Sequence, residues 1–171
     1  SKDKCLRPML APHLYYLLND LLRLWEKPVR IFETGGCFRK ETQGAKHSAE
    51  FTMLNLVEMG LPQENREQRL KELTSLVMET AGIKNYRLQS EHSTVYGETT
   101  DIEASSDRME NVEVGSAAFG PHPLDKAWRI TVPWVGIGFD LERLLMIREN
   151  SPNLAAMTRS LAYQNGIRLK L

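Results

Sequence analysis

The sequence shows no excess of charge of either sign, no long apolar run and few cysteines. Its 171 residues include 22 Lys and Arg against 22 Asp and Glu, so the formal net charge is zero. A balanced chain has no global attraction to nucleic acid or anionic lipid, and any such partner needs a local patch. No apolar run reaches the roughly 18 residues that a membrane-spanning helix needs, and no signal peptide is recognisable. These absences predict a soluble chain with no membrane partner.

The two cysteines, Cys5 and Cys37, form no CxxC pair and have no metal-ligand spacing with any histidine. Each is expected to be a buried, reduced thiol, and the cytoplasm is the expected compartment. The sequence also lacks internal repeats, low-complexity tracts and linkers long enough to separate domains. A chain of this length fits one domain with a single core, so we predict one domain over residues 1–171.

Hydrophobic periodicity predicts helices separated by a succession of strands. Helices are expected at residues 14–25, at 62–82, from 140 onward and near 153–163. Strands are expected at 28–40, with an interruption at Gly35 and Gly36, and at 50–60, 85–90, 92–103, 111–120 and 128–139. Because the strands follow one another rather than alternating with helices, we predict an α+β fold in which helices flank an antiparallel sheet.

Two of these elements have an inner face that can be named. On the strand at 50–60, alternate residues share a side that is apolar except for one amide: Phe51, Met53, Asn55, Val57 and Met59. In the helix at 62–82 the expected inward residues are Leu70, Leu73, Leu76, Val77 and Ala81, with Gly82 as the cap.

Three short segments contain the residues that could perform chemistry. In the first, Arg39 and Glu41 point to the same face of an extended chain. An Arg fork can hold a phosphate, and a neighbouring carboxylate can accept an amine or bind a divalent cation. A plain surface ion pair is the simpler explanation. Phe51, where the chain returns, could stack a base or belong to the core.

The second segment is VEVGSAAFG, at residues 112–120. Glu113 and Ser116 would face opposite sides of a regular strand. A bulge at Gly115, where a bulge is least costly, could turn both oxygens toward one ion. The alternative is a glutamate at a sheet edge and a buried serine, and both interpretations stay open.

The third segment is WVGIGFDLERLL, at residues 134–145. Gly136 and Gly138 allow backbone or ligand to approach closely, and Arg143 lies one turn into the following helix. A dinucleotide-binding motif is excluded because Leu141 occupies the position of its third glycine. Arg143 is either a helix-surface charge or, given its apolar neighbours, a cation with a dedicated anionic partner.

The order of these segments resembles a known family. FRKE, a loop, EFTMLN, an acidic strand and GIGFDLER follow one another as do the second and third signature motifs of class II aminoacyl-tRNA synthetases. The segments LRPMLAPHLY, FRKETQGAKHSAEFTMLNL, VYGETTDIE, VEVGSAAFGPHPLD and PWVGIGFDLERLLMI resemble the catalytic domain of the pyrrolysyl-tRNA synthetase family within that class. The resemblance covers essentially the whole chain and implies the class II synthetase catalytic fold.

The resemblance implies activation of a lysine derivative as an aminoacyl-adenylate and its transfer to tRNA, with ATP and Mg2+ as cofactors. The implied catalytic residues are Arg39, which would bind the α-phosphate, and Arg143, which would sandwich the adenine with Phe51. The implied ATP-binding set is Arg39, Glu41, His47, Glu50, Phe51, Glu113, Ser116 and Arg143, of which Glu113 and Ser116 would hold the metal. The implied amino-acid pocket is Ala11, Leu14, Tyr15, Leu18, Met53, Asn55, Val57, Tyr96, Ser116, Ala118, Trp134 and Gly138.

Within that pocket, Asn55 is the one amide on its strand face and would pair with the side-chain amide of an acylated lysine. Asp140 departs from the family, which usually has glycine there; it could cap the helix, coordinate a metal or weaken ATP binding. Val57 and Ala118 differ from the cysteine and valine usual at those sites, so a different acyl group could be favoured.

The family's first motif, which builds its dimer interface, has no counterpart in the sequence, so the chain is expected to be truncated at the front. The expected partners are tRNA, the amino acid, a second copy if the first motif is supplied, and a separate tRNA-binding protein. Arg30, Arg39, Lys40 and Lys46 are a candidate tRNA patch, although ordinary solvated charges are the simpler explanation. The alternatives to a synthetase are an adenylate-forming paralogue that charges no tRNA and a non-catalytic module that binds ATP or an amino acid.

Overall fold

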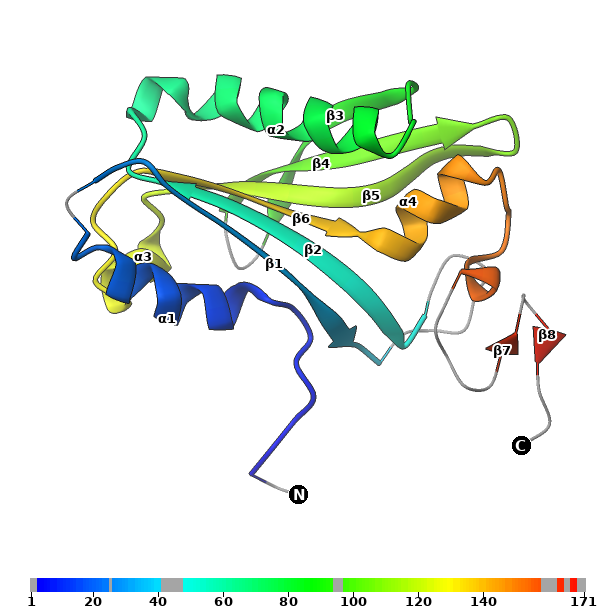
Figure 1. The fold of residues 1–171 in the computed structure, drawn as a ribbon, viewed down its shortest axis with the longest axis horizontal. Helices are drawn as coiled ribbons and strands as arrows, with labels where there is room; N and C mark the ends of the chain where they lie inside the picture. The colour runs from blue at the N-terminus through cyan, green and yellow to red at the C-terminus, as the bar shows by residue number, and fades with distance from the viewer. Residues whose placement is uncertain are drawn as a thin grey trace.

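The computed structural model describes residues 3–24, 26–40, 48–93 and 97–157 and the backbone of 163–164 and 167–168. Its centre is a six-stranded sheet in the order β1-β2-β6-β5-β4-β3, with every neighbouring pair antiparallel (Figure 1). The strands are β1 (Val29–Phe38), β2 (Glu50–Met59), β3 (Tyr86–Ser93), β4 (Gly97–Ser106), β5 (Met109–Gly120) and β6 (Trp134–Asp140). The predicted α+β fold is confirmed.

Helices cover both faces of the sheet (Figure 1). On one face lie α2 (Arg66–Thr80), which follows the 3-10 turn η1 (Gln63–Asn65), and α4 (Leu141–Arg148); on the other lies α1 (Ala11–Leu21). The short α3 (Pro123–Ala127) connects β5 to β6, and η2 (Leu154–Ala156) precedes a small hairpin of β7 (Tyr163–Gln164) and β8 (Ile167–Arg168). Among the described residues, none of these helices is long and apolar enough to cross a membrane.

The central strand β6 is apolar toward both faces, because each face packs against helices. Val135, Ile137 and Phe139 enter the large core that α2 and α4 cover. Trp134 points the other way and packs with Met59 in a second cluster beneath α1. The sheet is therefore the middle layer of three, and a ligand site on it must lie between sheet and helix.

The inner face of α2 differs from the sequence prediction at one position. Leu70, Leu73, Thr74 and Met78 are buried, whereas Leu76 is 59% exposed. At 3.6 residues per turn, Leu76 lies roughly 130° around the helix from the centre of the buried stripe. The assignment of Leu76 to the core is therefore wrong.

The strand predicted at 128–139 begins only at Trp134. Residues 123–127, just before the predicted strand, form α3, and Arg129 within the predicted strand has a positive φ of 60° that interrupts an extended chain. Pro133 has no backbone N–H to donate to a ladder. The extended run can therefore start only after the proline.

Two predicted helices are shorter than expected. After Leu21, the N–H groups of Arg23 and Leu24 bond to carbonyls three residues back, which tightens the last turn and ends α1; Trp25 lies outside the described residues. Near 153–163 the described part contains η2 and, at Tyr163, the start of β7. The Asn153 side chain accepts from the Ala155 N–H and forms a local turn instead of a longer helix. Residues 158–162 lie outside the described part.

The strand predicted at 92–103 is divided between two strands. Residues 92–93 end β3, and β4 begins at Gly97, whose φ of +72° suits the reversal of the chain. Gly82, the expected cap of α2, likewise has a positive φ of 73°. That prediction is confirmed.

β1 runs through Gly35 and Gly36 without the predicted interruption. Its pairing with β2 is continuous from Val29↔Met59 to Phe38↔Glu50. A Cβ at Gly35 would collide with the guanidinium of Arg7, whose Nε donates to the Gly36 carbonyl at 2.8 Å. The glycines therefore allow the N-terminal segment to lie against β1 instead of ending the strand.

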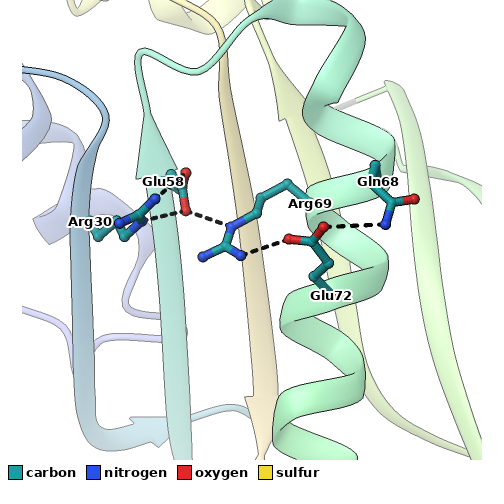
Figure 2. Close-up of polar contacts among 5 residues, drawn as sticks. All are labelled: Arg30, Glu58, Gln68, Arg69 and Glu72. Carbon is teal, nitrogen blue, oxygen red and sulfur yellow. Dashed lines mark hydrogen bonds and ion pairs between the residues drawn. The ribbon is translucent and has the colours of Figure 1, made fainter.

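A buried glutamate joins the sheet edge to α2 (Figure 2). Glu58 of β2 is 4% exposed and accepts from Arg30 Nε of β1 at 2.9 Å and from Arg69 Nε of α2 at 2.7 Å. Arg69 donates onward to Glu72 at 2.8 Å. Burial alone would raise the pKa of Glu58, but the hydrogen bonds from the two arginines outweigh burial and lower it.

Candidate functional site

A cavity of about 220 Å³ lies between α1 and the sheet, over β2, β6 and β5. Strand register defines its two ends, because β2 pairs with β6 from Met59↔Trp134 to Met53↔Asp140. Residues near Trp134 form an apolar end that α1 covers. Residues near Asp140 form an end with charged side chains.

The charged end begins with Arg39 and Phe51, on either side of the hairpin between β1 and β2. The Arg39 guanidinium lies over the Phe51 ring, 4.9 Å from its centroid, and Arg39 Nε donates to the Pro8 carbonyl at 2.9 Å. Phe51 packs with Leu10 and Cys37 and also lines the cavity. The ring is thus anchored in a small core while one part of it remains available to the site. Cys37 is buried as expected, whereas the expectation is wrong for Cys5, which is exposed in the N-terminal segment.

Arg143 enters the same cavity from α4. Its Nη1 donates to the Glu113 carbonyl at 2.8 Å and lies 3.6 Å from the Glu113 carboxylate, and its Nε lies 3.4 Å from Asp140 Oδ2. Arg143 is therefore a cation with anionic partners, the second of the two sequence interpretations. Partial burial raises the pKa of Glu113, and the charge of Arg143 opposes that shift.

Glu113 and Ser116 both line the cavity. The pairing of β5 with β4 slips at Val114, which has no partner in β4. One extra residue reverses the side-chain alternation, so two positions of opposite parity come to share a face. The bulge expected at Gly115 is found beside it, and it places both oxygens on the same side of the sheet.

Asp140 is the N-cap of α4, because its Oδ1 accepts from the Arg143 backbone N–H at 3.0 Å. Of the three roles proposed for Asp140, the structure shows the capping role. Burial raises the pKa of Asp140 to about 6; the hydrogen bond and charge of Arg143 oppose the shift, and Glu142 adds to it. A carboxylate that resists ionisation thus lies in the charged end of the cavity.

Asn55, Gly138 and Ser116 form one row across the middle of the cavity. A Cβ at Gly138 would lie 2.9 Å from Asn55 Oδ1, so the glycine leaves room for the amide. Asn55 is 7% exposed, and Oδ1 is buried without a hydrogen-bond partner among the described residues. An unpaired buried acceptor costs about 1–3 kcal/mol, and a ligand that donates a hydrogen bond would remove that cost.

The apolar end consists of side chains from α1 and the sheet, namely Leu14, Tyr15, Leu18, Val57 and Trp134. The Tyr15 ring meets the Trp134 indole edge-on, with 6.4 Å between centroids. Trp134 Nε1 donates to Asp125 Oδ2 at 2.7 Å, and Asp125 is 1% exposed. A buried carboxylate therefore holds the indole that forms the wall of the pocket.

This chain matches a known family over nearly its whole length. The family model described as tRNA synthetases class II core domain (F) matches residues 5–165. The chain belongs to this family.

Two solved structures are similar to this class II core domain. The crystal structure of pyrrolysyl-tRNA synthetase from Desulfitobacterium hafniense has a TM-score of 0.83 and 55% identity, over 98% of this chain and 58% of that chain. The structure of Desulfitobacterium hafniense PylSc, a pyrrolysyl tRNA synthetase, has a TM-score of 0.83 and 55% identity, over 96% of this chain and 58% of that one. The class II core domain thus spans 58% of the length of these two solved chains.

Most residues predicted for the site line this one cavity of the class II core domain. They are Ala11, Leu14, Tyr15, Leu18, Arg39, Phe51, Met53, Asn55, Val57, Glu113, Ser116, Ala118, Trp134, Gly138 and Arg143. Glu50 is exposed at the start of β2 and is not part of the cavity lining. Glu41, His47 and Tyr96 lie outside the described residues. The individual roles of all these residues stay predictions.

The candidate tRNA patch is not continuous. Arg30 and Arg39 lie at opposite ends of β1, roughly 30 Å apart at the rise of a strand. Arg30 is also bound to Glu58. Arg30 is therefore separated from the other candidates by the length of β1, and the patch stays a prediction; Lys40 is exposed, and Lys46 lies outside the described residues.

Two buried carboxylates that hold residues in or next to the cavity of the class II core domain were not identified from the sequence. Asp125 holds Trp134, and Glu142, which is 4% exposed, holds Thr52. An acidic residue in a first helical turn is common because it interacts favourably with the helix dipole. Nothing in the sequence therefore distinguishes Glu142 from an ordinary exposed glutamate.

A metal in this class II core domain would have few protein ligands. Within the described part of the chain, no group of three or more His, Cys, Asp and Glu side chains is placed to hold a metal ion. Glu113 and Ser116 form a pair of oxygen donors beside the charged end. That set fits Mg2+, which usually takes one or two protein ligands together with substrate phosphates and water.

Proposed function

We propose that this class II core domain activates a lysine derivative with ATP and transfers it to a tRNA. The observation that carries the proposal is a single cavity in which Arg39 and Arg143, from distant segments, meet beside an apolar pocket containing the unpaired amide of Asn55. The 55% identity to pyrrolysyl-tRNA synthetases favours a synthetase over a non-catalytic paralogue.

The charged end is the proposed site of ATP. An oxygen of the amino-acid carboxylate attacks the α-phosphorus, the bond from that phosphorus to the bridging oxygen breaks, and pyrophosphate leaves with its electrons. Arg39 stabilises the charge that develops on the α-phosphate, while Phe51 and Arg143 hold the adenine between them. No side chain has to act as nucleophile, so positioning supplies most of the rate.

Glu113 and Ser116 are the proposed holders of Mg2+, which supplies charge neutralisation at the triphosphate. The bulge at Val114 supports this assignment because it turns both oxygens toward the cavity. The hydrogen bond from Arg143 Nη1 to the Glu113 carbonyl holds Glu113 next to the proposed adenine site.

The apolar end is the proposed site of the amino-acid side chain. An acylated lysine presents an amide N–H and an amide carbonyl. Asn55 Oδ1 can accept a hydrogen bond from the N–H, and the Asn55 side-chain nitrogen can donate one to the carbonyl. The acyl group would then lie among Tyr15, Val57 and Trp134. In the second step a ribose hydroxyl of the tRNA attacks the adenylate carbonyl, and AMP leaves.

The proposed partners are a tRNA, a second copy of the chain and a separate tRNA-binding protein. The proposed compartment is the cytoplasm. Because Arg30 is paired with Glu58, tRNA contact is expected near Arg39 and Lys40 instead.

Pyrophosphate exchange into ATP tests this function directly. Wild type should catalyse exchange with at least one member of a panel of Nε-acylated lysines and not with unmodified lysine. Arg39→Ala should reduce the rate about 100-fold or more, since it removes charge stabilisation in the transition state. Stabilisation by ligands without any exchange would contradict the proposal and indicate a binding module.

A further inference from the structure

The ladder between β2 and β6 ends before β2 does. The last pair is Met53↔Asp140, because the chain turns into α4 after Asp140. β2 nevertheless continues to Glu50 and remains paired with β1 on its other edge. Within the described part of the chain, no strand therefore pairs with the Phe51 end of β2 on the β6 side.

Glu142 of α4 takes the place of the missing strand. Its Oε2 accepts from the Thr52 backbone N–H at 2.7 Å, and its Oε1 accepts from Thr52 Oγ1 at 2.8 Å. Glu142 is 4% exposed. A buried carboxylate is a costly group to use for packing alone, since an apolar residue of similar volume usually stabilises a core at least as well.

The two residues joined by this contact are the chain neighbours of two proposed walls of the adenine site. Thr52 follows Phe51, and Glu142 precedes Arg143. Neither Thr52 nor Glu142 lines the cavity, because along β2 alternate side chains face opposite sides of the sheet. The contact itself can therefore influence a nucleotide only through the positions of Phe51 and Arg143. The charge of Glu142 also acts on Asp140, and Glu142→Gln, which removes this charge but keeps an acceptor for Thr52, separates the two effects.

We propose that Glu142 is a positioning residue: by holding Thr52, it sets the separation of Phe51 and Arg143 and thereby the affinity for ATP. This inference rests on the proposed function. It assigns no effect to the amino-acid pocket, because Val57 of β2 and Trp134 of β6 lie at the other end of the ladder between these two strands, where the pairing is complete.

A matched control comes from a second buried glutamate. Glu58 is also 4% exposed, and it is held by Arg30 and Arg69 far from the charged end (Figure 2). Glu142→Ala and Glu58→Ala both remove a buried carboxylate and its hydrogen bonds. Only the first disconnects β2 from α4, so any general loss of stability can be separated from a change in the site.

The experiment measures the KM of ATP and the KM of the acylated lysine in pyrophosphate exchange, with the melting temperature of each variant. Glu142→Ala should raise the KM of ATP about tenfold or more while the KM of the amino acid stays within about twofold. Glu58→Ala should leave both within about twofold. Glu142→Gln, which can still accept from the Thr52 N–H, should restore most of the ATP affinity. The KM of ATP in Thr52→Val should lie between those of wild type and Glu142→Ala.

Equal changes in both KM values, or an unchanged KM of ATP in Glu142→Ala, would overturn the positioning role. An increase in the KM of ATP in Glu58→Ala as large as that in Glu142→Ala would also overturn it. If wild type shows no exchange with any amino acid, the proposed reaction fails, and calorimetric titration with ATP then decides the inference. A greater loss of ATP binding in Glu142→Ala than in Glu58→Ala supports it, whereas equal loss, or no binding by wild type, refutes it.

Discussion

Asp140 caps the helix that contains Arg143 and at the same time lies 3.4 Å from that arginine's Nε. One carboxylate thus fixes both the backbone and the side chain of the cation that we place at the adenine. The contact also puts a negative charge where a triphosphate is expected, and burial opposes that charge. Protonation of Asp140 should therefore matter for stability near neutral pH.

The stability of the chain should depend on pH through Asp140. Its pKa is raised from 3.8 to about 6, so the folded state binds this proton more tightly than the unfolded state does, and stability falls as pH rises from about 4 to 6. Asp140→Asn keeps a capping side chain and removes the charge. Its free energy of unfolding relative to wild type should increase with pH across this window, by at most about 3 kcal/mol.

Urea denaturation of both proteins at several pH values between 4 and 8 checks this prediction. Asp107→Asn, at an exposed acidic position, is the control and should show a flat difference. A flat difference for Asp140→Asn as well would mean that burial does not disfavour the charged form.

The contribution of Glu58 to stability should depend on pH in the opposite direction to that of Asp140. Its pKa is lowered from 4.5 because the hydrogen bonds from Arg30 and Arg69 outweigh burial. The contribution is present above about pH 4.5 and is lost as pH falls through the lower folded value. Glu58→Gln should therefore destabilise the fold by about 1–3 kcal/mol at pH 7 and by less at pH 3.

The two arginines around Glu58 should not be equivalent. Arg69 is 27% exposed and also binds Glu72, whereas Arg30 is 63% exposed. Arg69→Ala should lower the free energy of unfolding more than Arg30→Ala, because solvent already screens the pair at the sheet edge. Chemical denaturation of the two variants at pH 7 gives the comparison, and a larger loss for Arg30→Ala would contradict it.

Asn55→Leu should separate stability from recognition. Because Asn55 Oδ1 is buried without a partner among the described residues, its replacement by an apolar side chain should not lower the melting temperature. The KM of an acylated lysine in pyrophosphate exchange should rise roughly 10- to 100-fold, while the KM of ATP serves as the internal control. A rise in both KM values together would point to a distorted sheet rather than to a lost hydrogen bond.

Asp125 should control the apolar end of the cavity through Trp134. Its Oδ2 accepts from Trp134 Nε1 and from the His122 backbone N–H, both at 2.7 Å. Asp125→Ala leaves these donors unpaired and should cost about 1–3 kcal/mol of stability. Asp125→Asn keeps an acceptor and should cost less. Thermal denaturation and the KM of the amino acid should change in the same order; equal effects of the two variants would refute this.

Local features of the site could be predicted because each depends on residues close in the chain. Alternation along β2 placed Phe51 and Asn55 on one face, and the glycine in VEVGS marked the region of a bulge. A cap was among the roles open to Asp140, since a carboxylate before a helix can accept from its first N–H groups. These are short-range geometric consequences of residue type.

The amino-acid sequence by itself therefore determined most of the strands and helices, the parity of the β2 face and the residues available for binding. Only the tertiary structure decided which of them meet. Glu142 reaches Thr52 across 90 positions, and Asp125 of α3 supports Trp134 at the start of β6. Leu76 is apolar yet exposed, because the way a helix packs selects one stripe of it. Such contacts depend on strand order and helix placement, and spacing along the chain does not specify either.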